Sequence, residues 1–212
     1  MKQKPHIGII YPNYFPEDFG EVVTSAFKHE KLNLYLEREE PKIWSSVEWA
    51  IPGIISAYIL KPYFEAFLKE AGKDHYNLLK KGLNKLLKLN KNAPVETLTS
   101  SMSTKKVDKE NTQSKAISIH IEIKDGRKLK LLFDNDLEVE DWTNGLENIL
   151  DRVQNHYLGF PNDELTLKLE PLEKDPRFQI FAIMNKETKE WEFLDLRTMT
   201  ANKLKEKKEN GG

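Results

Sequence analysis

Histidine and carboxylate side chains are the residues of this chain that could bind a metal ion or transfer protons. The five histidines are His6, His29, His75, His120 and His156. No two of them are four residues apart, the spacing that presents a histidine pair to zinc from one helix. The sequence therefore predicts no metal site, and we interpret the five histidines as separate side chains.

Other clusters of polar residues are also interpreted as structural. Asp74, His75 and Tyr76 are consecutive, so in a helix they point in different directions. The acidic run from Asp134 to Asp141 lacks the glycine and the final glutamate of a calcium loop, and it suits the positive end of a helix. Residues 12–20 are not rich in glycine and do not form a phosphate cradle. We therefore predict no catalytic residue and no cofactor.

Composition narrows the classes of function further. The chain has 212 residues, and its 33 Lys and Arg nearly balance its 34 Asp and Glu, so a general affinity for polyanions is not expected. It contains no cysteine, which excludes disulfides and thiolate chemistry and favours a cytoplasmic location. The most apolar stretch, residues 49–60, is shorter than the roughly 20 residues that span a bilayer. We do not expect the chain to act in a membrane.

Positive charge is concentrated in one segment. Between Lys73 and Gln113 there are nine lysines and four acidic residues, but one aromatic residue, Tyr76, and no arginine. Such a face can contact phosphates, whereas base stacking and bidentate base recognition are poorly served. A solvated helix face is the first interpretation, and weak nucleic-acid binding by the helix at 73–91 is the alternative. Its candidate residues are Lys80, Lys81, Lys85 and Lys88.

A polar segment divides the chain into two halves. Residues 91–114 have no aromatic side chain and no apolar period, so burial cannot offset the entropy lost on ordering them. The sequence predicts an α+β protein of two small domains, residues 1–90 and 115–196, joined by a flexible linker at 91–114. Residues 197–212 form a polar tail in this interpretation.

The first half is predicted to be helix-rich, with the order βαβαα. The pattern indicates a strand at residues 6–11, a helix at 17–29 and a strand at 32–36. Residues 54–71 are apolar nearly all round and are interpreted as a helix bent at Pro62. A final helix is expected at 73–89.

The helix predicted at residues 54–71 contains more aromatic side chains than one buried face requires. A small domain cannot easily cover every side of such a helix. We therefore expect part of it to lie at a self-association or partner-protein interface, with core packing as the competing interpretation. The residues concerned are Tyr58, Tyr63, Phe64 and Phe67.

The second half shows a clearer pattern, which predicts the order ββαβββ. Ile117, Ile119, Ile121 and Ile123 alternate with polar residues, and Asp125-Gly126 is a hairpin turn signal. A second strand is expected at 129–133 and a helix at 138–157. Three further strands are expected at 165–169, 178–184 and 191–196.

This element order, followed by Gly211-Gly212 at the end of a polar tail, resembles a ubiquitin-like β-grasp protein. The resemblance covers residues 115–212, and the first half resembles no family. It implies activation and conjugation through the terminal Gly-Gly, so that Gly211 and Gly212 would be the functional residues.

The sequence as a whole favours a non-catalytic protein–protein interaction or regulatory module. The alternatives are a ubiquitin-like modifier and a weak nucleic-acid-binding protein that uses the lysine-rich helix. A protein partner or a second copy of the chain is the expected ligand.

Overall fold

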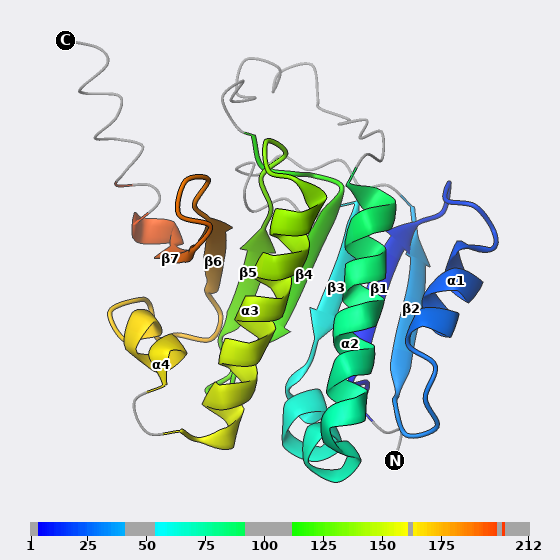
Figure 1. Ribbon diagram of the computed structural model, residues 1–212, viewed down its shortest axis with the longest axis horizontal. Coiled ribbons are helices and arrows are strands. Elements are labelled where there is room, and N and C mark those ends of the chain that lie inside the picture. The colour runs from blue at the N-terminus through cyan, green and yellow to red at the C-terminus, as the bar shows by residue number, and fades with distance from the viewer. Residues whose placement is uncertain (1–3, 41–53, 92–111, 161–162, 199–200, 202–212) are drawn as a thin grey trace.

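The chain folds into helices packed on a seven-stranded mixed sheet (Figure 1). The computed structural model describes residues 4–40, 54–91, 112–160, 163–198 and 201, without the side chains of residues 66–74. The first half contributes β1 (Ile7–Pro12), α1 (Phe19–Ala26), β2 (Leu34–Glu39), β3 (Ile55–Ile59), the π-helical turn η2 (Tyr63–Phe67) and α2 (Leu68–Asn90). The second half contributes β4 (Ile117–Glu122), β5 (Lys128–Leu132), α3 (Val139–Leu158), α4 (Glu164–Leu169), β6 (Gln179–Met184) and β7 (Trp191–Asp195).

Strands from both halves pair in one continuous sheet, in the order β2-β1-β3-β4-β5-β6-β7. The pairs β1–β2, β3–β4 and β5–β6 are parallel, and a helix connects the two strands of each pair. The remaining neighbours are antiparallel. The β3–β4 pair joins the two predicted halves at the centre of the sheet.

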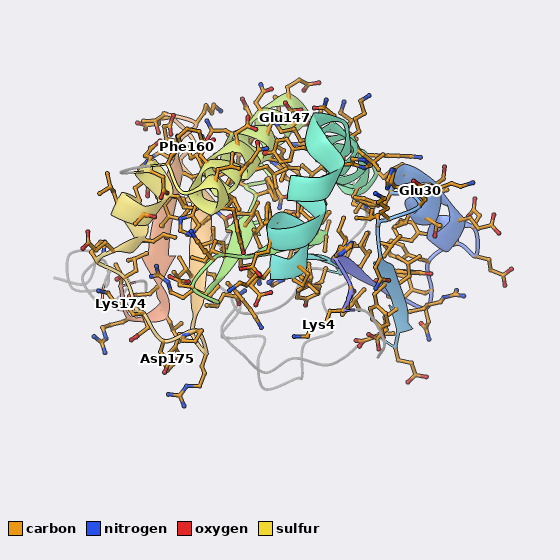
Figure 2. All side chains as sticks on the ribbon, turned by 90° about the horizontal axis from the view of Figure 1, so that it is seen from below. Lys4, Glu30, Glu147, Phe160, Lys174 and Asp175 are labelled. Atoms are coloured by element: carbon orange, nitrogen blue, oxygen red, sulfur yellow. The ribbon has the colours of Figure 1, made fainter. Side chains whose placement is uncertain are left out.

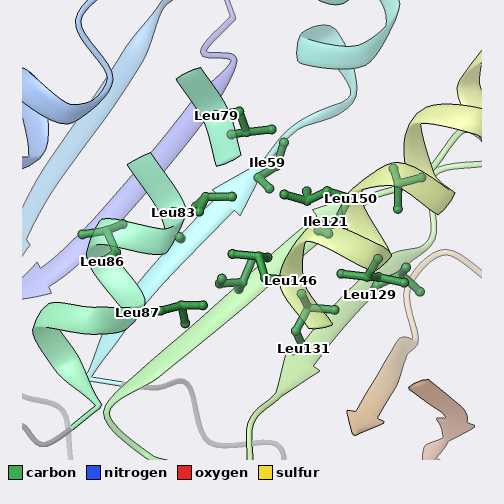
Figure 3. Close-up of a cluster of buried hydrophobic side chains, with 14 of the residues drawn as sticks. Ile59, Leu79, Leu83, Leu86, Leu87, Ile121, Leu129, Leu131, Leu146 and Leu150 are labelled. Atoms are coloured by element: carbon green, nitrogen blue, oxygen red, sulfur yellow. The ribbon is translucent and has the colours of Figure 1, made fainter. Parts of the chain in front are cut away.

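The described helices lie on one face of this sheet (Figure 2). Apolar side chains from alternate strand positions meet the apolar faces of α2 and α3 and form one core that spans both halves (Figure 3). Ile59, Leu83, Ile121 and Leu146 are each fully buried in it. Burial of apolar area at roughly 25 cal/mol per Å² makes this layer the main stabilising contact of the fold.

Capping residues at both ends of α3 explain where this helix begins and ends. Glu138 and Asp141 form a reciprocal capping box at its N-terminus. The chain leaves the helix at Gly159, whose φ of 73° is in the left-handed region that glycine adopts without strain. The predicted hairpin turn is also present, with a φ of 89° at Gly126.

The α+β class is confirmed, but two predicted elements are wrong. Residues 54–60 do not begin a helix, because Ile55–Ile59 is strand β3, between β1 and β4. Residues 165–169 are not a strand but helix α4, whose N-cap Asp163 accepts a hydrogen bond from the Thr166 N–H. The first half therefore has the order βαββ followed by η2 and α2, and the second half has the order ββααββ instead of ββαβββ.

The predicted linker and tail fall mostly outside the described residues. At the end of the linker, Gln113 forms an isolated bridge with Asp134, and the Ser114 N–H donates to the Phe133 carbonyl. Of the tail, residues 197, 198 and 201 are described. Within the described part of the chain, no helix combines the length and the apolar character needed to cross a membrane.

Candidate functional site

The outward face of α2 carries a stripe of three exposed lysines. Lys81, Lys85 and Lys88 recur at intervals of four and three residues, so they share one side of the helix. Together with Asn84 and the half-exposed Leu89, they line a shallow surface depression of about 430 Å³. We refer to these five residues as the lysine face.

The packing of α2 fixes the direction of this face. Leu79, Leu83, Leu86 and Leu87 are buried against the sheet and the neighbouring helices. Gly82 lies against α1, where a Cβ would come within 3.0 Å of three atoms of the Phe27 ring. With these sides of the helix occupied, the lysine face is directed to solvent.

Lys80, the fourth lysine of the predicted nucleic-acid face, takes part in polar contacts between α2 and α3. The Tyr76 hydroxyl donates to Asp151 at 2.9 Å, and Lys80 is ion-paired with Asp151 at 2.7 Å. Further along α2, the Asn84 side-chain N–H donates to Glu147 at 2.8 Å. Lys80 is therefore part of the helix–helix contact, and it does not line the depression with the other three lysines.

The three lysines of the lysine face differ from much of the described basic surface in their lack of ion pairs. In the described residues, Lys81, Lys85 and Lys88 form no ion pair. Basic side chains around α3 are largely paired. These pairs are Lys80 with Asp151, Arg152 with Glu164 and Glu190, Lys186 with Asp134 and Asp136, and Lys189 with Asp141. The positive charge of the lysine face is thus available to a ligand.

The Asn84 side chain of the lysine face is only partly used in hydrogen bonding. Its amide nitrogen is used by Glu147, while its Oδ1 atom is buried and accepts no hydrogen bond within the described part of the chain. An unsatisfied carbonyl oxygen requires an N–H or O–H donor. Because this acceptor is buried, the face offers a ligand positive charge and an exposed leucine.

A second group of polar residues lies on the face of the sheet opposite to the helices. Tyr58 on β3, His120 on β4 and Lys130 on β5 are register partners, so their side chains project from the same face. The rings of Tyr58 and His120 are stacked, with centroids 4.6 Å apart and an interplanar angle of 15°. The Gln179 side-chain nitrogen lies 2.9 Å from His120 Nδ1. We call these four residues the polar row.

Burial changes the ionisation of this row. Lys130 is 1% exposed, and burial lowers the pKa of its ammonium to about 8. Burial, together with the charges of Lys130 and Lys128, lowers the pKa of His120 to about 3. At neutral pH the imidazole is therefore neutral and the amine is still mostly charged. Perturbed ionisable groups held together in this way are typical of functional sites.

The aromatic residues predicted at an interface occupy different environments. Tyr63 and Phe64 are fully buried in the core, where the Phe64 ring stacks on Tyr157 at 4.6 Å. Tyr58 is half-buried in the polar row, and the Phe67 side chain lies outside the described residues. Tyr63 and Phe64 therefore do not form an exposed surface of this chain. Gly211 and Gly212 are outside the described residues, so conjugation through them stays a prediction.

The remaining histidine and acidic clusters have local structural roles. His156 Nδ1 lies 3.0 Å from the Thr166 hydroxyl and 3.4 Å from Asp163, at the junction of α3 and α4. The acidic run at 134–141 is partly neutralised by Lys186 and Lys189. The described residues contain no group of three or more His, Asp or Glu that could hold a metal ion.

Sequence reasoning missed His120 and Lys130. The alternation of β4 and β5 places both opposite to the core-facing isoleucines and leucines, and the sequence analysis assigned neither of them to a site. Periodicity identifies the face of a strand but does not show whether that second face is buried. The one available signal was the type of residue, because histidine and lysine both titrate when they are buried.

Comparisons with family models, curated proteins and solved structures find no match for this chain. Its function is therefore inferred from the geometry of the chain itself.

Proposed function

We propose that the protein is a non-catalytic interaction module that binds an acidic segment of a protein partner on the lysine face. The observation that carries the proposal is the depression lined by Lys81, Lys85 and Lys88, which form no ion pair within the described part of the chain. Charge complementarity of this kind accelerates association and selects partners of opposite charge.

Two features favour an acidic protein segment over nucleic acid. The lining residues include no aromatic side chain and no arginine, so base stacking and bidentate base contacts have no donor there. Half-exposed Leu89 provides an apolar contact for a peptide side chain.

The close packing of α2 against its neighbours supports a role of this helix in binding a partner. The helix is held by the core on one side, by α1 at Gly82 and by α3 through Asp151 and Glu147. A preorganised helix face loses little entropy when a partner docks, and more of the interaction energy then appears as affinity.

The test is affinity capture with two matched variants of the full chain. Lys81→Glu/Lys85→Glu/Lys88→Glu reverses the lysine face, and Lys31→Glu/Lys124→Glu/Lys174→Glu makes the same change of net charge at exposed lysines elsewhere. A specific protein partner should bind the wild type and the control, and its affinity for the first variant should fall at least tenfold, which is about 1.4 kcal/mol.

Nuclease treatment separates the two candidate ligands. Capture that survives nuclease and is lost in the lysine-face variant supports the acidic protein partner. Capture that disappears with nuclease supports the nucleic-acid alternative. A partner that binds both variants as well as the wild type shows that the lysine face is not the binding site.

A further inference from the structure

Three acidic side chains gather at the start of α1. Asp18 is the N-cap of this helix, Glu21 lies in its first turn, and Glu17 immediately precedes the cap. All three are exposed, and none of them forms an ion pair within the described part of the chain. The positive end of the helix stabilises carboxylates at these positions, but it leaves their charge exposed to solvent. We call these three residues the acidic patch.

The acidic patch faces away from the sheet. Phe19 and Val23 are buried under α1, so Glu21, which is two residues from each of them, lies on the opposite side of the helix. The lysine face of α2 is also directed to solvent. Because the described helices lie on one face of the sheet, the two charged surfaces are presented on the same side of the molecule (Figure 2).

The acidic patch and the lysine face also lie at the same end of the sheet. The helix α1 follows the end of β1, where Ile10 pairs with Ser56 near the start of β3. The helix α2 follows the other end of β3, beyond Ile59, and runs back along the sheet, so its last turns are level with the start of β3 (Figure 1). The first turn of α1 and the last turns of α2 therefore lie at one end of the helix layer.

The two helices are direct neighbours. Phe27, the C-cap of α1, lies against Gly82 of α2. Each copy of the chain therefore carries a basic surface and an acidic surface next to each other. In the described residues the two surfaces form no ion pair with one another, so both charges are available to a second molecule.

We propose that the acidic segment bound by the lysine face is the acidic patch of a second copy of this chain. This inference rests on the proposed function, because it names the partner of the same site. A two-fold axis that runs parallel to the helices, between α1 and α2, places the acidic patch of each copy on the lysine face of the other. One axis thus forms both contacts at once, as in the isologous interfaces of most homodimers.

The interface is predominantly electrostatic. Each contact brings three carboxylates to three ammonium groups, an arrangement that accelerates association and is weakened by salt. Tyr14, in the connection before α1, and Leu89, near the end of α2, are 58% and 52% exposed and add apolar area at the same end of the helix layer. We therefore expect a reversible dimer whose affinity falls as the ionic strength rises.

The experiment is sedimentation velocity of the full chain over a range of concentrations, at low and at high salt. The wild type should form dimers at low salt and dissociate at high salt. Two charge-reversal variants place like charges on both contacts, and each should dimerise more weakly by about tenfold or more. These variants are Lys81→Glu/Lys85→Glu/Lys88→Glu and Glu17→Lys/Asp18→Lys/Glu21→Lys.

An equimolar mixture of the two variants separates loss of the contact from loss of the fold. In the mixed dimer both contacts again join opposite charges, so association should return to the level of the wild type. The matched control mixes the α1 variant with Lys31→Glu/Lys124→Glu/Lys174→Glu, which has the same net charge as the α2 variant. In that pair one of the two contacts stays repulsive, and association should be weaker than in the rescued pair by about tenfold or more.

A wild type that sediments as a monomer at every concentration overturns this inference. A dimer that either charge-reversal variant retains, or a mixture that does not restore association, overturns it as well. Binding of a decaglutamate peptide to the lysine face judges the proposed function separately. Peptide binding by a chain that stays monomeric leaves the acidic-partner proposal standing with a different partner, whereas absence of both peptide binding and dimer refutes both.

Discussion

Replacing Lys130 by Met should stabilise the protein at neutral pH. The Lys130 side chain is 1% exposed, and burial lowers the pKa of its amine from 10.5 to about 8. Each pKa unit corresponds to about 1.36 kcal/mol, so the folded state holds the charged amine at a cost of about 3 kcal/mol relative to the unfolded chain. Met fills a similar unbranched volume without a charge. We therefore expect Lys130→Met to raise the free energy of unfolding at pH 7 by about 3 kcal/mol.

The pH dependence of the stability difference between Lys130→Met and the wild type shows whether the charge of Lys130 causes it. Between about pH 8 and 10.5 the unfolded chain still holds the Lys130 proton while the folded chain has released it, so the wild type gains stability as the pH rises. The Lys130→Met variant has no such proton, and its advantage should shrink from about 3 kcal/mol at pH 7 to about 1 kcal/mol at pH 10.

Urea unfolding of both proteins at the two pH values measures this difference. Taking the difference between variant and wild type removes the titration of the other lysines and tyrosines. A variant that is less stable at pH 7, or a difference that does not change with pH, would refute the reasoning.

Three further predictions concern packing and the joint between the halves. Gly82→Ala should lower the free energy of unfolding by up to about 2 kcal/mol, because a clash with Phe27 exceeds the gain in helix propensity. Its cost in thermal or urea unfolding should fall in a Phe27→Leu background, and an equal cost in both would contradict this contact. Tyr76→Phe should cost about 1 kcal/mol in urea unfolding through loss of the hydrogen bond to Asp151, and no change would contradict it. Protease cleavage within residues 92–114 should leave two fragments that elute together on gel filtration, because they share one sheet and one core, whereas separated fragments would show independent domains.

The sequence predicted those elements whose hydrophobic periodicity is compatible with only one type of secondary structure. Alternation at Ile117, Ile119 and Ile121 indicated β4, and the 3.6-residue period of the segment ending at Tyr157 indicated α3. The exposed positions of Lys81, Lys85 and Lys88 followed from the same period in α2. Sequence reasoning therefore identified most of the lysine face, although it grouped Lys80 with these residues.

The predictions that were wrong concern segments whose hydrophobic pattern is compatible with either a strand or a helix. Ile55–Ile59 lies at the centre of the sheet, and a central strand has the continuous apolar run that a buried helix also has. Leu165 and Leu169 are compatible with one face of a strand or with one face of a helix, and the Asp163 cap decided between them. The order of the strands depends on contacts between distant residues, which no local pattern contains.

The polar row could not be predicted for a related reason. His120 and Lys130 come together because β4 and β5 pair in one particular register, and their pKa values depend on burial that arises from the complete fold. From the sequence, the two residues are ordinary polar positions of a half-buried hairpin.

The most direct test of the proposed function is to map the binding of a decaglutamate peptide on the labelled full chain by amide chemical shifts. The account predicts shifts that saturate, that cluster on residues 81–89 of α2, and that disappear in Lys81→Glu/Lys85→Glu/Lys88→Glu but persist in Lys31→Glu/Lys124→Glu/Lys174→Glu. Shifts that spread over all exposed lysines, or that are absent from α2, would contradict an acidic-partner site on the lysine face.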